Sequence, residues 1–446
     1  MSFVYDFLKA YRAQNAVRLH MPGHKGHALI PELTQASAFD ITEIAGADSL
    51  FEDEGILLAS EQKTASLYGA KETLYCAGGS TLCIQTMLAC VTKSGDTIIA
   101  GRNAHTALLN SCVLLDLKPV WVLPQYHPGS HISGEITPES VENALKCHPE
   151  AACVYITAPD YLGCLSDVKA IAKIAHRYGK PLLCDNAHGA YLHFGKEPLH
   201  PMDLGVDMCS DSAHKTLPAL TGAAYLHIGK SCGVTREQAK QVMHLFGSTS
   251  PSYLILLSLD ACADYMEGDL RRDCANMEEQ VSILRKALAA KGGLFEMRRA
   301  EPGKLTIDCL ALGYTGAELA ASMRSFTPMI EPEYVSYGEI VLMFSPMNTE
   351  SDYKAAGAWI RSIVPRKAIL RKAERLVLPE AVLSPREAYF LPKETVAVHE
   401  SIGRIAAENR IVCPPGVPVL AAGERIDKDS VKFLQMTGIL EINVVQ

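Results

Sequence analysis

Short apolar runs alternate with longer segments of helical period along most of this chain, and this alternation constrains the fold more than any other feature. Each run has the length of a strand, and a helical segment such as residues 167–178 ends at a Gly-Lys-Pro stop before the next run. The candidate strands are residues 97–100, 119–123, 152–156, 181–184 and 223–228. Strands that alternate with helices predict an α/β fold, in which helices flank a mostly parallel sheet.

The rhythm changes after about residue 250, and this change predicts further domains. A long helical stretch covers about residues 254–291, strand-like residues 304–308 begin a smaller α+β unit, and prolines become frequent beyond residue 365. A chain of 446 residues is long enough for one large core and additional smaller ones. We expect an amino-terminal arm, a large domain, a linker helix with a small α+β domain, and a C-terminal capping domain, at residues 1–40, 41–255, 256–365 and 366–446.

Charge and cysteine usage exclude several classes of function. The formal net charge of −8, without a compensating Lys/Arg-rich run, speaks against a nucleic-acid partner. No apolar run approaches the roughly 20 residues that span a bilayer, and the first residues lack the order of a signal peptide, so we expect a cytoplasmic protein with no membrane partner. The 14 cysteines are scattered, with neither CxxC pairs nor zinc spacing, and predict reduced thiols and no metal site.

One lysine has the surroundings of a covalent catalyst. Lys215 ends the motif Ser212-Ala213-His214-Lys215, just after an apolar, strand-like segment, where it can form a Schiff base. A lone Ser-x-His-Lys sequence more often marks a solvated surface charge. Upstream, the candidate strand 181–184 ends in Asp185 and a glycine turn. Ligands of open α/β sheets bind beyond the carboxyl ends of the strands, so Asp185 falls where a site is expected, although it could also be a simple helix N-cap.

Gly79, Ser80 and Thr81 form a candidate phosphate-binding turn. They lie between residues 75–77 and the helix-like residues 82–91, so their N–H groups and hydroxyls can hold a phosphate at a helix N-terminus. An ordinary helix cap is the plainer interpretation of these three residues alone. Together with a Schiff-base lysine and a strand-end carboxylate, they make up the set of groups that pyridoxal phosphate requires. The sequence therefore predicts pyridoxal 5'-phosphate as the cofactor.

Five motifs, in their order along the chain, resemble those of the Orn/Lys/Arg decarboxylase family of fold-type I pyridoxal phosphate enzymes. They are residues 20–26 (His-Met-Pro-Gly-His-Lys-Gly), 79–81 (Gly-Ser-Thr), 102–105 (Arg-Asn-Ala-His), 185–190 (Asp-Asn-Ala-His-Gly-Ala) and 212–221. The likeness spans nearly the whole chain, whose length is similar to that of the short members without an amino-terminal wing domain. The resemblance implies a transferase-like fold-type I architecture and an amino acid decarboxylase.

The resemblance also implies roles for individual residues. Lys215 would carry the cofactor, Asp185 would pair with its pyridine nitrogen, and His105 would stack on its ring and could donate a proton. These three are the predicted catalytic residues. The other predicted cofactor-binding residues are Gly79, Ser80, Thr81, His188, Ser212, His214, Ser248 and Thr249.

Two segments predict a homodimer as the minimal unit. Residues 20–26 are similar to an element at the dimer's active-site region in the family. Residues 248–250 resemble a segment that approaches the cofactor of the neighbouring subunit. A shared site makes the dimer obligatory, and a higher homo-oligomer stays open.

The resemblance implies arginine, lysine or ornithine as substrate, and polyamine biosynthesis as the setting. The distal cation of such a substrate needs a partner, and an acidic cluster lies near the family's site segments, although such charges are usually solvated. The members of this cluster are Asp48, Glu52, Asp53 and Glu54.

The chain departs from the family's usual pattern at four positions around the expected cofactor ring and substrate. They are Gly101, Asn186, Tyr191 and Gly222. These departures leave the substrate open. They also leave open another fold-type I reaction (transamination, β-elimination or aldolase-type cleavage) and a non-catalytic protein that binds the cofactor.

Overall fold

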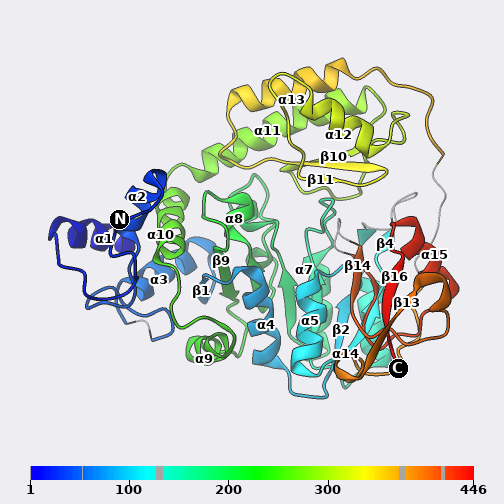
Figure 1. The fold of residues 1–446 in the computed structure, drawn as a ribbon, viewed down its shortest axis with the longest axis horizontal. Helices are drawn as coiled ribbons and strands as arrows, with labels where there is room; N and C mark the ends of the chain where they lie inside the picture. The colour runs from blue at the N-terminus through cyan, green and yellow to red at the C-terminus, as the bar shows by residue number, and fades with distance from the viewer. Residues whose placement is uncertain (1, 53, 127–133, 371–376, 413–416) are drawn as a thin grey trace. The chain divides into compact units, whose positions relative to one another are not determined.

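The computed structural model describes residues 2–52, 54–126, 134–370, 377–412 and 417–446. The chain divides into two compact units, and each unit is made of two separate stretches. The first unit comprises Met1–Val91 and Leu183–Cys274, and the second comprises Thr92–Leu182 and Ala275–Gln446. The two units therefore interleave along the chain, whose course Figure 1 colours from blue to red.

The first unit is built on four adjacent strands whose pairing changes direction. The order is β1 (Glu72–Cys76), β9 (Ala224–Ile228), β8 (Met208–Asp211) and β7 (Leu182–Asp185). Strand β7 runs parallel to β8, whereas β8 with β9 and β9 with β1 are antiparallel pairs. Every residue of β7, β8 and β9 is buried, which explains why β7 and β9 are mostly apolar rather than alternating, whereas β8 ends in the buried polar residues Ser210 and Asp211.

Helices cover these strands. Helices α3 and α10 pack on β1, and α4 packs on β8 and β9. The helices of this unit are α1 (Phe3–Ala13), α2 (Thr34–Phe39), α3 (Ile56–Tyr68), α4 (Gly79–Val91), α8 (Ala213–Thr216), α9 (Arg236–Phe246), α10 (Tyr253–Glu267) and the start of α11 (Leu270–Ala289). The short 3-10 helices are η1 (Pro31–Leu33), η2 (Ala190–His193) and η3 (Pro201–Asp203). The buried Asp260 carboxylate on α10 accepts the Val4 N–H at 2.9 Å and so anchors the amino-terminal end of α1.

The second unit contains three parallel strands in the order β6, β2, β3. Their bounds are β6 (Val154–Thr157), β2 (Thr97–Gly101) and β3 (Lys118–Val122). Helices α5 (Thr106–Leu115), α6 (Pro138–Cys147) and α7 (Val168–Arg177) accompany them. The Asp167 side chain accepts the Ala170 N–H at 3.1 Å and caps α7, and the turn at Gly179, with φ of +68°, ends it. Strands β4 (Gln125–Tyr126) and β5 (Gly134–Glu135) pair with each other in an antiparallel direction.

Two smaller sheet regions complete the second unit. In the antiparallel sheet β10-β12-β11, the strands are β10 (Lys304–Asp308), β12 (Glu339–Met343) and β11 (Tyr334–Val335), with α12 (Gly316–Arg324) packed on β11 and β12. Figure 1 shows α12 and α13 (Glu350–Ser362) beside this sheet. The C-terminal region contains α14 (Pro385–Phe390), β13 (Lys393–Ala397), η4 (Val398–Glu400), β14 (Arg410–Val412), β15 (Val417–Leu420), α15 (Lys428–Met436) and β16 (Glu441–Val445).

The structure confirms the predicted α/β class, since parallel pairs outnumber antiparallel ones among strands β1–β3 and β6–β9, and helices flank these strands. All five candidate strands are present within two residues of the predicted bounds. The stretch 254–291 is two helices rather than one, because α10 ends at Gly268 before α11 begins. Strand β1 was absent from the predicted set. The four domain boundaries stay a prediction.

Within the part of the chain that the structure describes, no helix is both long enough and apolar enough to cross a bilayer.

Candidate active site

Asp185 lies at the carboxyl end of β7 in the first unit. Its side chain is 2% exposed, and one carboxylate oxygen accepts the Ala187 N–H at 3.1 Å. In the parallel ladder Asp185 pairs with Ser210 of β8, so both strands end at this edge. Asp185 is therefore a buried carboxylate at the sheet edge where open α/β sheets bind ligands.

Lys215 follows β8 in the short helix α8, and it is half-buried. Its Nζ lies 3.1 Å from Nε2 of His188, which belongs to the turn that begins at Asp185. A neutral His188 ring that accepts from Lys215 carries its own proton on Nδ1. The ring of His214 is held differently, because its Nδ1 donates to the Ala223 carbonyl at 2.9 Å. The structure thus brings Lys215 and His188 together at the strand ends.

The predicted phosphate-binding turn begins α4. Gly79 has φ of +70°, a backbone conformation that glycine adopts without strain, and its N–H donates to the Gly222 carbonyl at 2.9 Å. The Ser212 hydroxyl donates to the Ser80 hydroxyl at 2.8 Å, which joins the turn to the segment that carries Lys215. With the positive end of α4 and the Thr81 hydroxyl, these groups form a cradle suited to an anion.

Several buried polar atoms beside these residues have no hydrogen-bond partner among the described residues. They are Oδ1 of Asn186, Oγ of Ser210 and Oγ1 of Thr216, and each belongs to a residue next to a strand end or next to Lys215. Buried polar atoms in folded proteins almost always have partners, so unpaired ones beside Lys215 and Asp185 are compatible with a site that a ligand completes. The amine, the carboxylate and the anion cradle fit the reactive and charged groups of pyridoxal phosphate.

Ser248 and Thr249 are exposed residues in the loop after α9. Ser248 lines a hollow of about 260 Å³ in the first unit together with Thr81 and Phe51. The hollow places the Ser248 loop beside the phosphate-binding turn of the same chain. The role predicted for this loop at a neighbouring subunit's cofactor stays a prediction.

His105 belongs to the second unit, where it caps α5. Its Nδ1 accepts the Ala107 N–H at 3.2 Å, and the side chain is exposed. This contact leaves Nε2 as the protonated nitrogen of the neutral ring. The predicted stacking of His105 on the cofactor stays a prediction.

The acidic segment is organised mainly by Asp48. This residue has φ of +72°, and its carboxylate accepts N–H groups of its own loop, among them those of Gly55 and Leu57 at 2.9 Å. Burial opposes the ionisation of Asp48, but these bonds outweigh it and hold the pKa of its carboxyl below the usual value. Glu52 and Glu54 are exposed, and Asp53 lies outside the described residues. Asp48 thus serves its own loop, and the predicted contact of this acidic cluster with a substrate cation stays a prediction.

Two of the four departures from the family pattern, Gly222 and Gly101, have a local steric reason. Gly222 has φ of +94°, which a larger residue would adopt only with strain. A Cβ at Gly101 would lie 3.0 Å from Oδ1 of Asn103 and 3.2 Å from Ile136, so the glycine makes room for both. Tyr191 is fully buried in η2.

A buried group beside the site was not predicted. The carboxylate of Asp211 accepts Nε2–H of His200 at 2.9 Å and of His227 at 3.2 Å through one oxygen, and Nδ2–H of Asn186 at 2.7 Å through the other. Burial raises the pKa of Asp211, but the two histidines outweigh it and bring that pKa well below its usual range. For His227, burial lowers the pKa despite the nearby carboxylate.

With Cys209, this group could hold a metal ion, because one donor atom from each of the four residues lies within 4.8 Å of the others. The hydrogen bonding favours a different state. Nδ1 of His200 accepts the Met202 N–H at 3.2 Å, so the ring proton is on Nε2, the nitrogen that a metal would need as a free lone pair. Sequence spacing gave no signal for this group, because its members come from separate segments.

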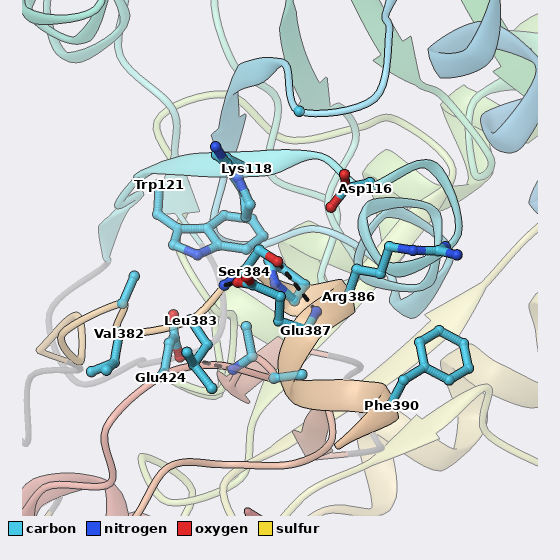
Figure 2. A pocket seen from close by; sticks show the side chains of 16 residues that line it. Asp116, Lys118, Trp121, Val382, Leu383, Ser384, Arg386, Glu387, Phe390 and Glu424 are labelled. Atoms are coloured by element: carbon cyan, nitrogen blue, oxygen red, sulfur yellow. Dashed lines mark hydrogen bonds between the residues drawn. The ribbon is translucent and has the colours of Figure 1, made fainter.

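A separate cavity of about 820 Å³ lies within the second unit (Figure 2). It is lined by β3 residues such as Trp121, by Ser384–Glu387 at the start of α14 and by Glu424. Figure 2 shows the Trp121 ring reaching from β3 toward the start of α14. The predicted cofactor-binding residues are not among those that line this cavity in the described chain.

Comparisons with known proteins agree with this geometry. The family model described as "Orn/Lys/Arg decarboxylase, major domain" matches residues 3–309, and the one for the C-terminal domain of the same family matches residues 367–441. An arginine decarboxylase of Bacillus subtilis is 29% identical over 97% of this chain and 92% of its own length. The uncharacterized protein YaaO of that organism is 30% identical over 97% and 93%.

Among solved structures, the lysine decarboxylase LdcF of Francisella novicida is similar with a TM-score of 0.83 at 18% identity, over 100% of this chain and 81% of that one. At this identity the structural likeness shows the fold. The architecture is that of fold-type I pyridoxal phosphate enzymes.

Proposed function

Because this chain belongs to the Orn/Lys/Arg decarboxylase family, we propose that it removes the α-carboxylate of a basic amino acid as carbon dioxide and releases the amine. Family membership implies pyridoxal 5'-phosphate as the cofactor. One observation carries the proposal: Lys215 contacts His188 of the Asp185 turn, and Ser212 of the lysine motif contacts Ser80 of the anion cradle. Residues that the family motifs bring to a cofactor are thus in mutual contact within one unit.

The site residues have separate tasks in this proposal. Bound pyridoxal phosphate supplies an electron-accepting ring that, once joined to the substrate amine, takes up the electron pair left by the departing carboxylate. Lys215 provides the amine that holds the cofactor between turnovers. Asp185 provides a buried negative charge for the ring nitrogen, and Ser80, Thr81 and Ser212 hold the phosphate at the start of α4.

Proton transfer completes the reaction. The carbon that loses the carboxylate must gain a proton, and Nζ of Lys215 and Nε2 of His105 are the two candidate donors in the proposal. The lone pair of His188 Nε2 lies 3.1 Å from Nζ of Lys215, so His188 would be placed to take a proton from the lysine amine and keep that amine nucleophilic.

Arginine is the first substrate to test, since full-length relatives are named arginine decarboxylase. Lysine and ornithine follow. The distal cation of a basic substrate would pair with a desolvated carboxylate of the enzyme. Norleucine has no such charge and would leave that carboxylate unpaired, so its kcat/KM should be lower by about a thousandfold or more.

The proposal is tested by turnover of arginine, lysine, ornithine and norleucine with the reconstituted protein, with products identified by mass spectrometry. We expect an amine and carbon dioxide from at least one basic amino acid, and no keto acid. Lys215→Ala is the matched control without turnover, and borohydride should fix the cofactor on the Lys215 peptide. A keto acid product, or an adduct on another lysine, would overturn the assignment.

We further propose that the enzyme is a cytoplasmic homodimer that serves polyamine biosynthesis. Apolar side chains in the amino-terminal arm (residues 1–40) are exposed to water in the single chain. Burying them against a second copy of the chain would be favourable. They are Val17 (82% exposed), Leu19 (89%), Met21 (62%), Leu29 (105%), Ile30 (55%) and Leu33 (51%). Light scattering should give a dimer or a multiple of it, and Leu19→Ser with Leu29→Ser should weaken the assembly. A parent chain that is monomeric at micromolar concentration would contradict this proposal.

A further inference from the structure

Asp211 lies between the two segments that carry the proposed catalytic groups. It is the last residue of β8, directly before Ser212, whose hydroxyl contacts Ser80 and whose carbonyl accepts the Lys215 N–H at 3.0 Å. On its other side it bonds to Asn186, the residue after Asp185. A shift of Asp211 would therefore reach both the lysine segment and the Asp185 turn.

Asn186 transmits the position of Asp211 to that turn. Its backbone N–H donates to the Ser210 carbonyl at 2.9 Å, and its Nδ2 donates to Asp211 at 2.7 Å, so both its backbone and its side chain are fixed to β8. Its Oδ1 faces Gly189, where an added Cβ would lie only 2.1 Å away. The conformation of the turn from Asp185 to Gly189 therefore requires a glycine at position 189 and an Asn186 side chain that is held in place.

The same turn carries His188, whose Nε2 contacts Lys215. A single path of contacts thus runs from Asp211 through Asn186 and the turn to His188 and the lysine. The distances along it are 2.7 Å and 3.1 Å, within hydrogen-bond range at both ends.

Asp211 is itself held firmly. The side chains of Asp211, His200 and His227 are fully buried, and both histidines donate to one carboxylate oxygen. The Met202 N–H fixes Nδ1 of His200, and the Thr73 hydroxyl lies 2.8 Å from Nδ1 of His227. A buried carboxylate with this many donors has one favourable position, because leaving any of its donors unpaired is costly.

We propose that Asp211 is a positioning residue of the active site: through Asn186 it fixes the turn that carries Asp185 and His188, and so it sets the contact between His188 and Lys215. This inference rests on the proposed function of Lys215 and Asp185. Asp211 touches neither of them in the contacts described above, and it acts through Asn186 and through the chain.

The test is a double-mutant cycle of Asp211→Asn and Asn186→Ala in the reconstituted enzyme. Two readouts are followed: kcat and KM, and the pH midpoint of the visible absorbance of the cofactor bound to Lys215. Each single variant should lower kcat about tenfold or more, leave KM within about threefold, and move the midpoint by about half a pH unit or more. The double variant should be no worse than the poorer single, since the amide of Asp211→Asn disturbs, and Asn186→Ala removes, the same link between β8 and the turn.

Asp260→Asn is the matched control. Asp260 is also a buried carboxylate of the first unit, 1% exposed, but it serves α1 and Ser60 rather than the Asp185 turn. The Asp260→Asn variant should be less stable than the parent. Its kcat and its absorbance midpoint should stay near the parent values. If Asp211→Asn unfolds the protein, Asn186→Ala, which leaves Asp211 with both histidines, decides the question by itself.

Additive losses in the cycle, or a midpoint equal to that of the parent in both single variants, would overturn the inference. Finding one zinc ion per chain in the parent protein and none in Cys209→Ser would also overturn the inference, because the Asp211 cluster would then be a metal site. Measuring the absorbance midpoint requires bound cofactor but no turnover. If the parent protein forms the Lys215 adduct but decarboxylates no amino acid, the proposed reaction is refuted. The midpoints of the variants still test the positioning role of Asp211 in that case. A parent that binds no cofactor overturns both.

Discussion

Among the buried carboxylates of the described residues, Asp211 in the first unit and Glu424 in the second have different partners. Glu424 is 2% exposed and faces the fully buried Arg102, with Nη1 to Oε1 at 2.6 Å and Nη2 to Oε2 at 2.8 Å. Arg102 also donates to the carbonyls of Pro418 and Val419 at 3.2 Å and lies 4.7 Å over the Trp121 ring. Asp211 instead faces two histidine rings and an amide.

The difference assigns the two clusters to different tasks. A guanidinium remains charged at any pH at which proteins fold, so a bidentate pair with it is a permanent tie, here between β2 and the C-terminal region. The Asp211 cluster, in contrast, is joined through Asn186 to the proposed catalytic turn. We therefore expect the Glu424 cluster to control stability and the Asp211 cluster to control turnover.

Glu424→Gln should produce the largest effect and separate stability from turnover. It leaves the Arg102 charge buried without its counter-ion, which should cost about 3–5 kcal/mol of unfolding free energy. Urea unfolding can be followed by Trp121 fluorescence in a Trp359→Phe background, since these are the two tryptophans of the chain. Below the transition, kcat should stay near that of the parent.

Glu380→Gln is the control for this variant. Glu380 pairs with Arg425 at 2.9 Å at an exposed surface position, 69% and 44% exposed respectively, where ion pairs contribute little. Equal losses of unfolding free energy in Glu424→Gln and Glu380→Gln would show that the buried Arg102–Glu424 pair contributes no more to stability than an exposed ion pair.

Asp185→Ala should show the opposite pattern. Removing the proposed charge partner of the cofactor ring should raise the barrier to turnover by about 3 kcal/mol or more, which is over a hundredfold in kcat. Cofactor affinity and unfolding should change far less. Steady-state kinetics measure turnover and cofactor titration measures cofactor affinity, and Asp260→Ala is the control for loss of a buried carboxylate. Near-normal turnover in folded Asp185→Ala would refute the proposed role of Asp185 at the cofactor ring.

The pH dependence distinguishes the two clusters further. Burial lowers the pKa of His227 below its unfolded value near 6.5, so below about pH 6.5 the unfolded chain binds a proton that the folded chain does not. Stability should therefore fall with decreasing pH, by up to about 1.4 kcal/mol per pH unit from this group. The depressed pKa of Asp211 acts in the same direction, but only in more acidic solution.

Urea unfolding between about pH 7.5 and pH 5 tests this slope. His227→Gln should flatten it relative to the parent, whereas Glu424→Gln should shift the curve down without changing its slope. Parallel curves for the parent and His227→Gln would contradict the assignment.

The sequence predicted the parts of the site whose signals are local. Asp185 ends a short apolar run before a glycine turn, and the Gly79 turn lies between a strand and a helix, so each could be found without knowing the neighbours in space. The Asp211 cluster could not, because it depends on the register that sets Cys209 of β8 opposite His227 of β9. Strand β1 was missed for a related reason: five residues that begin at Glu72 are a weak pattern until antiparallel pairing with β9 buries them.

The smallest effect is expected where carboxylates are exposed. Glu52 and Glu54 face water in the single chain, unlike Asp211 and Glu424, and exposed charges contribute little to binding a cation. Glu52→Gln and Glu54→Gln should each raise KM for arginine by at most about fivefold, with norleucine unaffected and Glu237→Gln, an exposed carboxylate on α9, as control. A loss of a hundredfold or more in kcat/KM for arginine alone would mean that the assembled enzyme buries this segment around the distal cation. The comparison between buried and exposed carboxylates would then have to be drawn for the dimer rather than for the single chain.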